Sequence, residues 1–288
     1  MGGQSGLDYY LWDREAQVIA SGSDGNKRQG QGEKGMRDPR SIVITGASSG
    51  IGEELARAYA APGVMLALSG RDSARLEAVA ERCRAAGAEV ETALVDAADR
   101  EAMTAWLTTL DARAPVDLVI ANAGISAGTG GGVESAEQAR RIFQVNVDGV
   151  LNSVHPLLPG MQARRRGQIA LMASLAGFRG MPGAPAYCAS KAAVRVYGES
   201  LRGDLAGQGI GVTVICPGFV KSRMTAVNRF PMPFLMEADR AAQVIRSGLA
   251  RNRARIAFPW PMAAATWLLA ALPVGVTDVL LRQAPRKE

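Results

Sequence analysis

The chain has 288 residues, of which 48% are hydrophobic and 33 are glycine, a composition that indicates a globular α/β protein with a substantial core. Its three cysteines are widely separated and form no C-x-x-C pair, so we expect neither a disulfide framework nor a metal site, and a cytoplasmic location fits best. The net charge of +6 is scattered without interleaved aromatic residues, which argues against nucleic-acid binding.

Residues 1–39 differ from the rest of the chain, because they are polar and rich in glycine between positions 21 and 35. Such a segment cannot bury an apolar face, so we predict a disordered N-terminal extension. Met36 lies just before the first predicted strand. One hypothesis is that translation naturally begins there.

From residue 40 to residue 258, strand patterns alternate with helical patterns. Apolar runs predict strands at 42–45, 64–68, 90–95, 118–121, 168–172, 212–216 and 255–258. Helices are predicted at 52–60, 73–86, 100–110, 137–158, 186–205 and 239–250. The alternation predicts a single α/β domain with a doubly wound, parallel, seven-stranded sheet that carries helices on both faces.

The first predicted strand leads directly into Gly46, Gly50 and Gly52, where a helix is predicted to begin. Glycines let the backbone approach a phosphate, and a helix N-terminus supplies N–H donors, so the loop indicates a phosphate site. The same loop also fits G-x-S-x-G, the nucleophile elbow of serine hydrolases, with Ser48 as the nucleophile. That alternative needs a histidine, and the chain has only His155 within a helical pattern, which disfavours it.

Tyr187 and Lys191 stand four residues apart in a predicted helix, and Ser174 lies thirteen residues before Tyr187. Four residues make about one helical turn, so the phenol and the ammonium project from the same face. A cation beside a phenol favours the phenolate and lowers its pKa, which would suit Tyr187 to general acid/base chemistry.

Several short motifs occur in one order along residues 41–258. Thr45 to Gly52, Asn122-Ala-Gly124, Asn146, Ser174, Tyr187-x-x-x-Lys191 and Pro217-Gly218 together resemble the short-chain dehydrogenase/reductase family. The resemblance implies a Rossmann domain and an NAD(P)-dependent oxidoreductase that transfers hydride between nicotinamide and a carbonyl or secondary alcohol. An epimerase or dehydratase of the same family, or a nucleotide-sensing protein without turnover, stays open as an alternative.

The resemblance also implies roles for individual residues. Tyr187 would be the general acid/base, Lys191 would bind the nicotinamide ribose and lower the Tyr187 pKa, and Ser174 would hydrogen-bond the substrate oxygen. Asn146 would hold a water that links Lys191 to solvent. The cofactor-binding residues implied are Gly46, Ser48, Ser49, Gly50, Ile51, Gly52, Arg71, Asp96, Asn122, Ala123, Gly124, Tyr187, Lys191, Pro217, Gly218, Val220 and Ser222.

The end of the second strand bears on the choice of cofactor. Gly70 stands where NAD-preferring family members carry an acidic residue, and Arg71 can pair with a 2′-phosphate. NADP(H) is therefore the favoured cofactor, although Asp72 could reach a ribose hydroxyl and Ser49 is not basic.

Residues 221–236 lie where the family places its substrate lid, and their methionines and phenylalanines favour a hydrophobic substrate. Arg223 and Arg229 could receive an acidic group. The 22 residues at 256–277 carry no charge, but prolines leave only 262–272 as an uninterrupted helix, too short to span a membrane. We expect the apolar extension at 259–288 to pack on the domain, a partner subunit or a membrane surface, and the family habit implies a homodimer or homotetramer.

Overall fold

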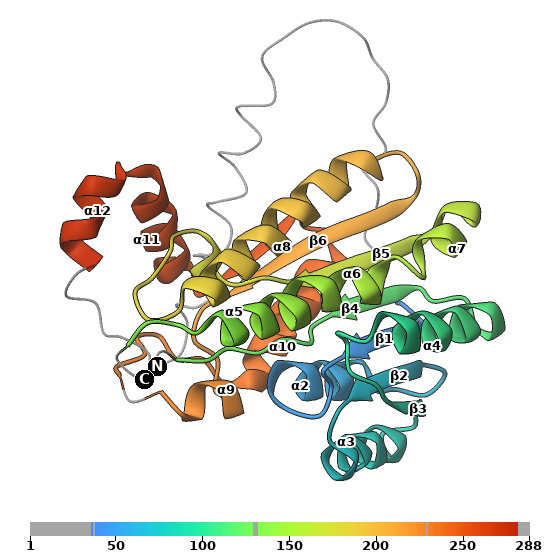
Figure 1. Cartoon of the computed structure of the whole chain (residues 1–288). Coiled ribbons are helices and arrows are strands. Elements are labelled where there is room, and N and C mark those ends of the chain that lie inside the picture. The colour runs from blue at the N-terminus through green and yellow to red at the C-terminus, as the bar shows by residue number, and fades with distance from the viewer. Residues whose placement is uncertain (1–35, 37, 129–131, 229, 282–288) are drawn as a thin grey trace, which may run out of the picture. The chain divides into compact units, whose positions relative to one another are not determined.

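The computed structural model describes residues 36, 38–128, 132–228 and 230–281, so the predicted N-terminal extension lies almost wholly outside it. The described chain contains a parallel sheet of seven strands in the order β3-β2-β1-β4-β5-β6-β7 (Figure 1). The strands are β1 Ser41–Thr45, β2 Met65–Gly70, β3 Glu89–Leu94, β4 Leu118–Ala121, β5 Gly167–Met172, β6 Ile210–Pro217 and β7 Arg255–Phe258. All seven predicted strands are confirmed, and so is the doubly wound fold class.

The helices between the strands follow the predicted pattern except over 137–158 and at the short helix α9, which was not predicted. They are α2 Gly50–Tyr59, α3 Ser73–Ala85, α4 Arg100–Arg113, α5 Ala136–Phe143, α6 Gly149–Val154, α7 Leu158–Ala163, α8 Pro185–Asp204, α9 Arg223–Ala226 and α10 Ala238–Ala250. The single helix predicted over 137–158 is wrong. A π-helical turn at Gln144–Asp148, η1, separates α5 from α6, and the helix stops at Val154 just before His155 and Pro156.

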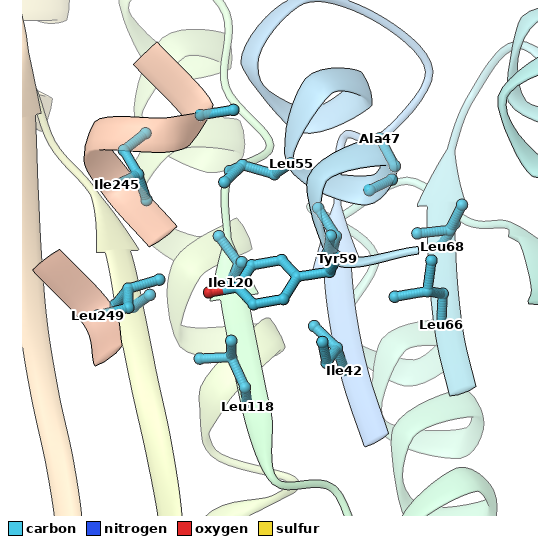
Figure 2. Close-up of a cluster of buried hydrophobic side chains, with 14 of the residues drawn as sticks. Ile42, Ala47, Leu55, Tyr59, Leu66, Leu68, Leu118, Ile120, Ile245 and Leu249 are labelled. Carbon is cyan, nitrogen blue, oxygen red and sulfur yellow. The ribbon is translucent and has the colours of Figure 1, made fainter. Parts of the chain in front are cut away.

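Two hydrophobic clusters hold the helices on opposite faces of the sheet. Because side chains alternate along a strand, Ile42 and Ile44 of β1 enter one cluster and Val43 enters the other. The first cluster packs α2, α3 and α10 on the sheet, and the second packs α4, α6 and α8. Figure 2 shows the ring of Tyr59 lying among side chains of the central strands and α10 in the first cluster.

The strand order places the functional loops together. β1 pairs in parallel with β2 on one side and with β4 on the other. The strands β2 and β3 are therefore added to one side of β1 and the strands β4 to β7 to the other, so the strand order reverses between β1 and β4. In such sheets, ligands bind outside the carboxyl ends of the strands at this reversal. The loops that follow β1, β2, β4, β5 and β6 all leave this edge.

The C-terminal segment forms two short helices after β7, α11 Trp260–Ala271 and α12 Val274–Leu281. α11 begins slightly before the predicted 262–272 because Pro261 occupies the first turn, where a proline is tolerated. α12 was not anticipated as a separate helix. Within the described residues, no helix has the length and apolar character needed to cross a bilayer.

Candidate active site

The glycine loop after β1 needs glycine at two positions for steric reasons. Gly46 has a φ of +67°, and a β-carbon there would lie 2.8 Å from the Ala123 Cα. A β-carbon at Gly52 would lie 2.4 Å from the carbonyl oxygen of Gly46. Both contacts are with backbone atoms, which cannot move aside as a side chain can. The loop is therefore tightly folded against the segment after β4.

The N-terminus of α2 opens into a cleft. Ser49 occupies its N-cap position, but the Ser49 side chain makes no capping hydrogen bond. An open cleft of about 430 Å³ lies here, lined by Ser48, Ser49 and Gly50 on one side and by residues 221–223 on the other. Uncapped N–H groups and the positive end of the helix dipole suit an anionic group, so the loop and helix fit a dinucleotide phosphate.

Asn122 joins the first two loops. Its side-chain amide donates to the carbonyl oxygens of Thr45 at 2.9 Å and Gly46 at 3.1 Å. In return, the Thr45 hydroxyl accepts from the backbone N–H groups of Asn122 and Ala123, each at 3.1 Å. These bonds hold the segment 122–124 against the glycine loop, at the carboxyl edge of the sheet.

Asn146 lies in the π-helical turn and is completely buried. Its Oδ1 accepts from the Ile125 N–H at 2.8 Å, while its Nδ2 donates to the Ile125 carbonyl and to the Ser190 hydroxyl, each at 3.0 Å. The side chain thus connects three segments: the turn itself, the loop after β4 and α8. A π-helical turn often marks a functional position, because it displaces one residue from the regular helical register.

Ser174 follows β5 and caps the short 3₁₀ helix Leu175–Gly177, η2. Its hydroxyl oxygen accepts from the Ala176 N–H at 3.1 Å, and its proton is donated to the Pro217 carbonyl at 3.3 Å. The serine is 8% exposed. It is therefore held at the point where the ends of β5 and β6 meet.

Tyr187 stands in the first turn of α8 and faces Ser174. Burial raises the pKa of the Tyr187 phenol, and a hydrogen bond with Ser174 opposes that shift without reversing it. The net lowering of this pKa that was predicted beside Lys191 is not found, because the pKa of the phenol is raised overall. The ammonium lies 5.9 Å from the centroid of the phenol ring, and desolvation is the stronger influence.

Lys191 lies one turn further along α8 and is 3% exposed. Its Nζ donates to the carbonyl oxygen of Met172 at 2.7 Å. Because burial penalises the charged form, the pKa of Lys191 falls to about 8. A β-carbon on Gly124 would lie 3.3 Å from this Nζ and 3.2 Å from the Asn146 Oδ1, so both groups border the loop after β4.

The end of β2 forms the other side of the glycine loop. A β-carbon at Gly70 would lie 3.2 Å from the Ser48 Cβ. Arg71 is exposed, whereas the Asp72 carboxylate caps α3 by accepting from the Arg75 N–H at 2.9 Å. Asp96 accepts from Ala98 and Arg141. Although burial raises the pKa of Asp96, these bonds and the charge of nearby Arg71 lower it overall.

The comparisons with known proteins agree with this geometry. The family model for short chain dehydrogenases matches residues 40–231. This chain belongs to the short-chain dehydrogenase family. Its members are NAD(P)-dependent oxidoreductases, so the predicted family and enzyme class are confirmed.

Individual relatives align with most of this chain and with nearly all of their own length. An uncharacterized oxidoreductase of Myxococcus xanthus is 42% identical over 245 residues, which are 85% of this chain and 97% of the relative. A short-chain dehydrogenase from Sphingobium yanoikuyae in complex with NADPH has a TM-score of 0.72 and 27% identity, covering 86% of this chain and 97% of its own. A Mycobacterium paratuberculosis enzyme bound to NAD, at 23% identity, covers 78% of this chain and 98% of its own with a TM-score of 0.70, which shows the shared fold.

Two residues of this short-chain dehydrogenase were missed by sequence reasoning. Arg75 lines the cleft beside Ser48, and its buried Nε has no hydrogen-bond partner among the described residues. Glu134 accepts from the Ala186 N–H at 3.0 Å and so caps α8 from a distant loop. Arg75 stands four residues after Arg71 in the sequence, so this second arginine near the end of β2 could have been noticed. Glu134 left no such signal, because the loop conformation alone brings it to α8.

The hydroxyl expected at Ser222 is present, but it is used locally. Ser222 caps α9 in a capping box with Thr225, and its Cβ lies 3.1 Å from where a β-carbon on Gly50 would sit. Val220 forms an isolated bridge with Met236, which closes the base of the predicted substrate segment. Arg223 is exposed, and Arg229 lies outside the described residues.

The serine hydrolase alternative has no structural support. The Nε2 of His155 lies 3.0 Å from the Tyr197 hydroxyl on an exposed surface, and the two share a hydrogen bond. Ser48 instead lines the cleft at the N-terminus of α2.

Proposed function

We propose that this enzyme is an NADP(H)-preferring carbonyl reductase or alcohol dehydrogenase, acting on a hydrophobic substrate with Tyr187 as the general acid/base. The observation that carries the proposal is the meeting of Ser174, Tyr187 and Lys191 at the carboxyl ends of β5 and β6. The Ser174 side chain is close enough to the phenol to oppose the rise in the Tyr187 pKa, and the ammonium lies 5.9 Å from the centroid of the phenol ring. Residues 40–258 would form the catalytic domain.

The residues divide the chemistry between them. The bound nicotinamide cofactor supplies the hydride for reduction and receives it in oxidation. During reduction, negative charge develops on the substrate oxygen. The Tyr187 hydroxyl would stabilise that charge by donating a hydrogen bond, and so would the Ser174 hydroxyl after its single proton turns from the Pro217 carbonyl to the substrate. Tyr187 then transfers its proton to that oxygen. Its raised pKa keeps the phenol protonated at neutral pH, which suits a proton donor.

Lys191 supports this step in two ways. Its positive charge stabilises the phenolate that remains after proton transfer. An ammonium has three N–H donors and the Met172 carbonyl takes one, so two can serve the hydroxyls of the nicotinamide ribose. Asn146 would act as a positioning residue, because its three hydrogen bonds hold α8 to the loop after β4.

The adenosine end supports NADP(H) over NAD(H). An acidic side chain at position 70 would meet Ser48, and Asp72 is occupied in capping α3, so neither position readily offers a carboxylate to ribose hydroxyls. Arg71 is exposed and Arg75 lines the cleft, so both guanidinium groups can attract a 2′-phosphate. Arg75 also pairs with Asp72 at 2.8 Å, which fixes its position.

The substrate segment supports a hydrophobic substrate. The rings of Phe219 and Phe230 pack edge to face with centroids 5.9 Å apart, and Phe234 is 58% exposed. Aromatic and methionine side chains of this kind offer adaptable apolar contacts. Ketones with long chains or fused rings would match this surface better than small sugars.

The proposal is tested by following NADPH absorbance with a panel of ketones and sugars. Tyr187→Phe should lower kcat by roughly 10²- to 10⁴-fold while nucleotide binding stays within a few-fold of the wild type. Tyr197→Phe is the matched control, because this tyrosine lies on the same helix but bonds only His155 among the described residues. Full function in Tyr187→Phe would point to a sensor, and a higher kcat/KM with NADH would refute the cofactor preference.

A further inference from the structure

The last two helices present an apolar surface that the described chain leaves uncovered. We define it by the exposed side chains of Trp260, Trp267, Leu268, Val274, Val276 and Val279, which are 51–64% accessible. None of the residues of α11 is fully buried. Exposed apolar patches of this kind on a soluble domain mark an interaction site rather than an ordinary surface.

The exposed arc of α11 is wide. Trp260, Ala265, Trp267, Leu268 and Ala270 are all exposed, and at 100° per residue they cover more than half of the helix circumference. A helix that packs on one neighbouring protein usually exposes a narrower apolar stripe. An extended apolar medium would cover such an arc more completely than a single protein face.

The surface offers almost no hydrogen bonds. Its polar groups are the two indole N–H groups and Asp278, and the Asp278 carboxylate is already paired with Arg179 at 3.0 Å. Interfaces between proteins carry about one hydrogen bond per 100–200 Å², which this surface could not supply. Indole rings with a single donor are instead typical of the level of lipid headgroups.

The geometry indicates a helix pair that lies on a bilayer. α11 has 12 residues and is therefore about 18 Å long, shorter than the roughly 30 Å hydrocarbon core.

The charge of the residues after α12 adds a preference for one class of lipid. Positions 282–288 contain three basic residues, Arg282, Arg286 and Lys287, and one acidic residue, Glu288. Basic residues beside an apolar helix are attracted to anionic headgroups.

We propose that α11 and α12 dock the enzyme on the surface of an anionic lipid bilayer. The same helices border the candidate active site. The sulfur of Met262 on α11 would lie 3.1 Å from a β-carbon on Gly218, directly after Pro217, to which Ser174 donates. Arg179, in the loop after Ser174, donates to the Thr277 hydroxyl of α12 at 2.9 Å. Docking would therefore place the substrate entrance next to the lipid phase.

The test is flotation of the full chain with vesicles of phosphatidylcholine alone and of phosphatidylcholine with 30% phosphatidylglycerol, roughly the anionic fraction needed for a strong surface potential. The wild type should float with the anionic vesicles and bind the neutral ones about tenfold more weakly or worse. The double variant Trp267→Ser/Val276→Ser should lose flotation. The triple variant Arg282→Gln/Arg286→Gln/Lys287→Gln should lose the preference for anionic lipid.

Leu94→Ser is the matched control, because Leu94 is 62% exposed on β3, at the opposite edge of the sheet from β7. It should float as the wild type does. Nucleotide binding by each variant shows that the fold is retained. Failure of the wild type to float would overturn the proposal. The proposal would also be overturned if the wild type formed a dimer that does not bind vesicles and the double variant were monomeric, since the surface would then bind a second copy of the chain. Neither outcome bears on catalysis, which the Tyr187→Phe assay tests separately.

Discussion

The side chain of Ser48 lies directly against Gly70, so that a β-carbon at position 70 would come within 3.2 Å of the Ser48 Cβ. The contact joins the glycine loop after β1 to the end of β2. The side chain that position 70 can accommodate therefore depends on the residue at position 48. We expect this pair to limit how the cofactor specificity of the enzyme can be changed.

We expect Gly70→Asp to weaken the use of both cofactors rather than to create an NAD enzyme. The new carboxylate would press on Ser48 and would repel the 2′-phosphate. Adding Ser48→Gly to Gly70→Asp should relieve the contact and raise kcat/KM for NADH above that of the single variant. Steady-state kinetics with both cofactors measure this, with Ser48→Gly alone as the control. Efficient NADH use by Gly70→Asp alone would show that the contact is not limiting.

Gly52→Ala should abolish cofactor binding or destabilise the fold, because its methyl group would lie 2.4 Å from the Gly46 carbonyl oxygen. Overpacking of this kind costs about 1–3 kcal/mol or more. Gly203→Ala is the matched control, since a β-carbon there meets nothing within 4 Å on helix α8. It should raise the free energy of unfolding by about 0.4–1 kcal/mol. Urea unfolding and nucleotide titration together distinguish the two effects.

The buried Lys191 should make stability depend on pH. Its pKa is about 8 in the folded chain and 10.5 ordinarily, so between these values the unfolded chain binds more protons. The contribution of Lys191 to the free energy of unfolding therefore rises with pH across this window, by about 3 kcal/mol in total. Lys191→Met removes this slope.

The measurement is the difference in free energy of unfolding between wild type and Lys191→Met at several pH values from 7 to 10.5. The raised pKa values of Tyr187 and Cys216 act in the opposite direction at alkaline pH, but they occur in both proteins and largely cancel in the difference. A difference that stays constant with pH would contradict the depressed pKa of Lys191.

Asn146→Ala should cost more stability than Ser190→Ala. The first change leaves the part-buried N–H and carbonyl of Ile125 without their side-chain partner, at about 1 kcal/mol or more each. The second removes a single hydroxyl that bonds Asn146 and the Tyr187 carbonyl. A positioning role further predicts that Asn146→Ala lowers kcat more than it raises KM. Equal losses of unfolding free energy and of kcat in the two variants would argue that Asn146 is not a positioning residue.

The fold and the one-turn spacing of Tyr187 and Lys191 on α8 were predictable because they depend on local patterns. Buried strands such as β1 and β5 appear as short apolar runs, and Tyr187 and Lys191 are related by a single helical turn. The π-helical turn at Asn146 was not predictable, because it depends on bonds to Ile125 and Ser190 that are distant in sequence. Pro156 did signal the end of α6 at Val154, although periodicity continued past it.

The pKa values of the site residues were the hardest feature to predict from the sequence. Spacing alone suggested that Lys191 would lower the Tyr187 pKa, but spacing carries no information about desolvation. Burial raises the pKa of the phenol and lowers that of the ammonium, and both effects depend on the packed structure. The cap that Glu134 places on α8 was equally inaccessible, because 52 residues separate the two bonded groups.

The central place of β1 has a consequence for how the chain is made. β1 is the first strand in the described part of the chain, yet one of its edges has no partner until β4 is made, more than 70 residues later. During that interval an apolar strand edge stays open, a state that favours aggregation and retention by chaperones. The nascent chain therefore carries this open edge until residue 121 emerges, well before any part of α8 exists.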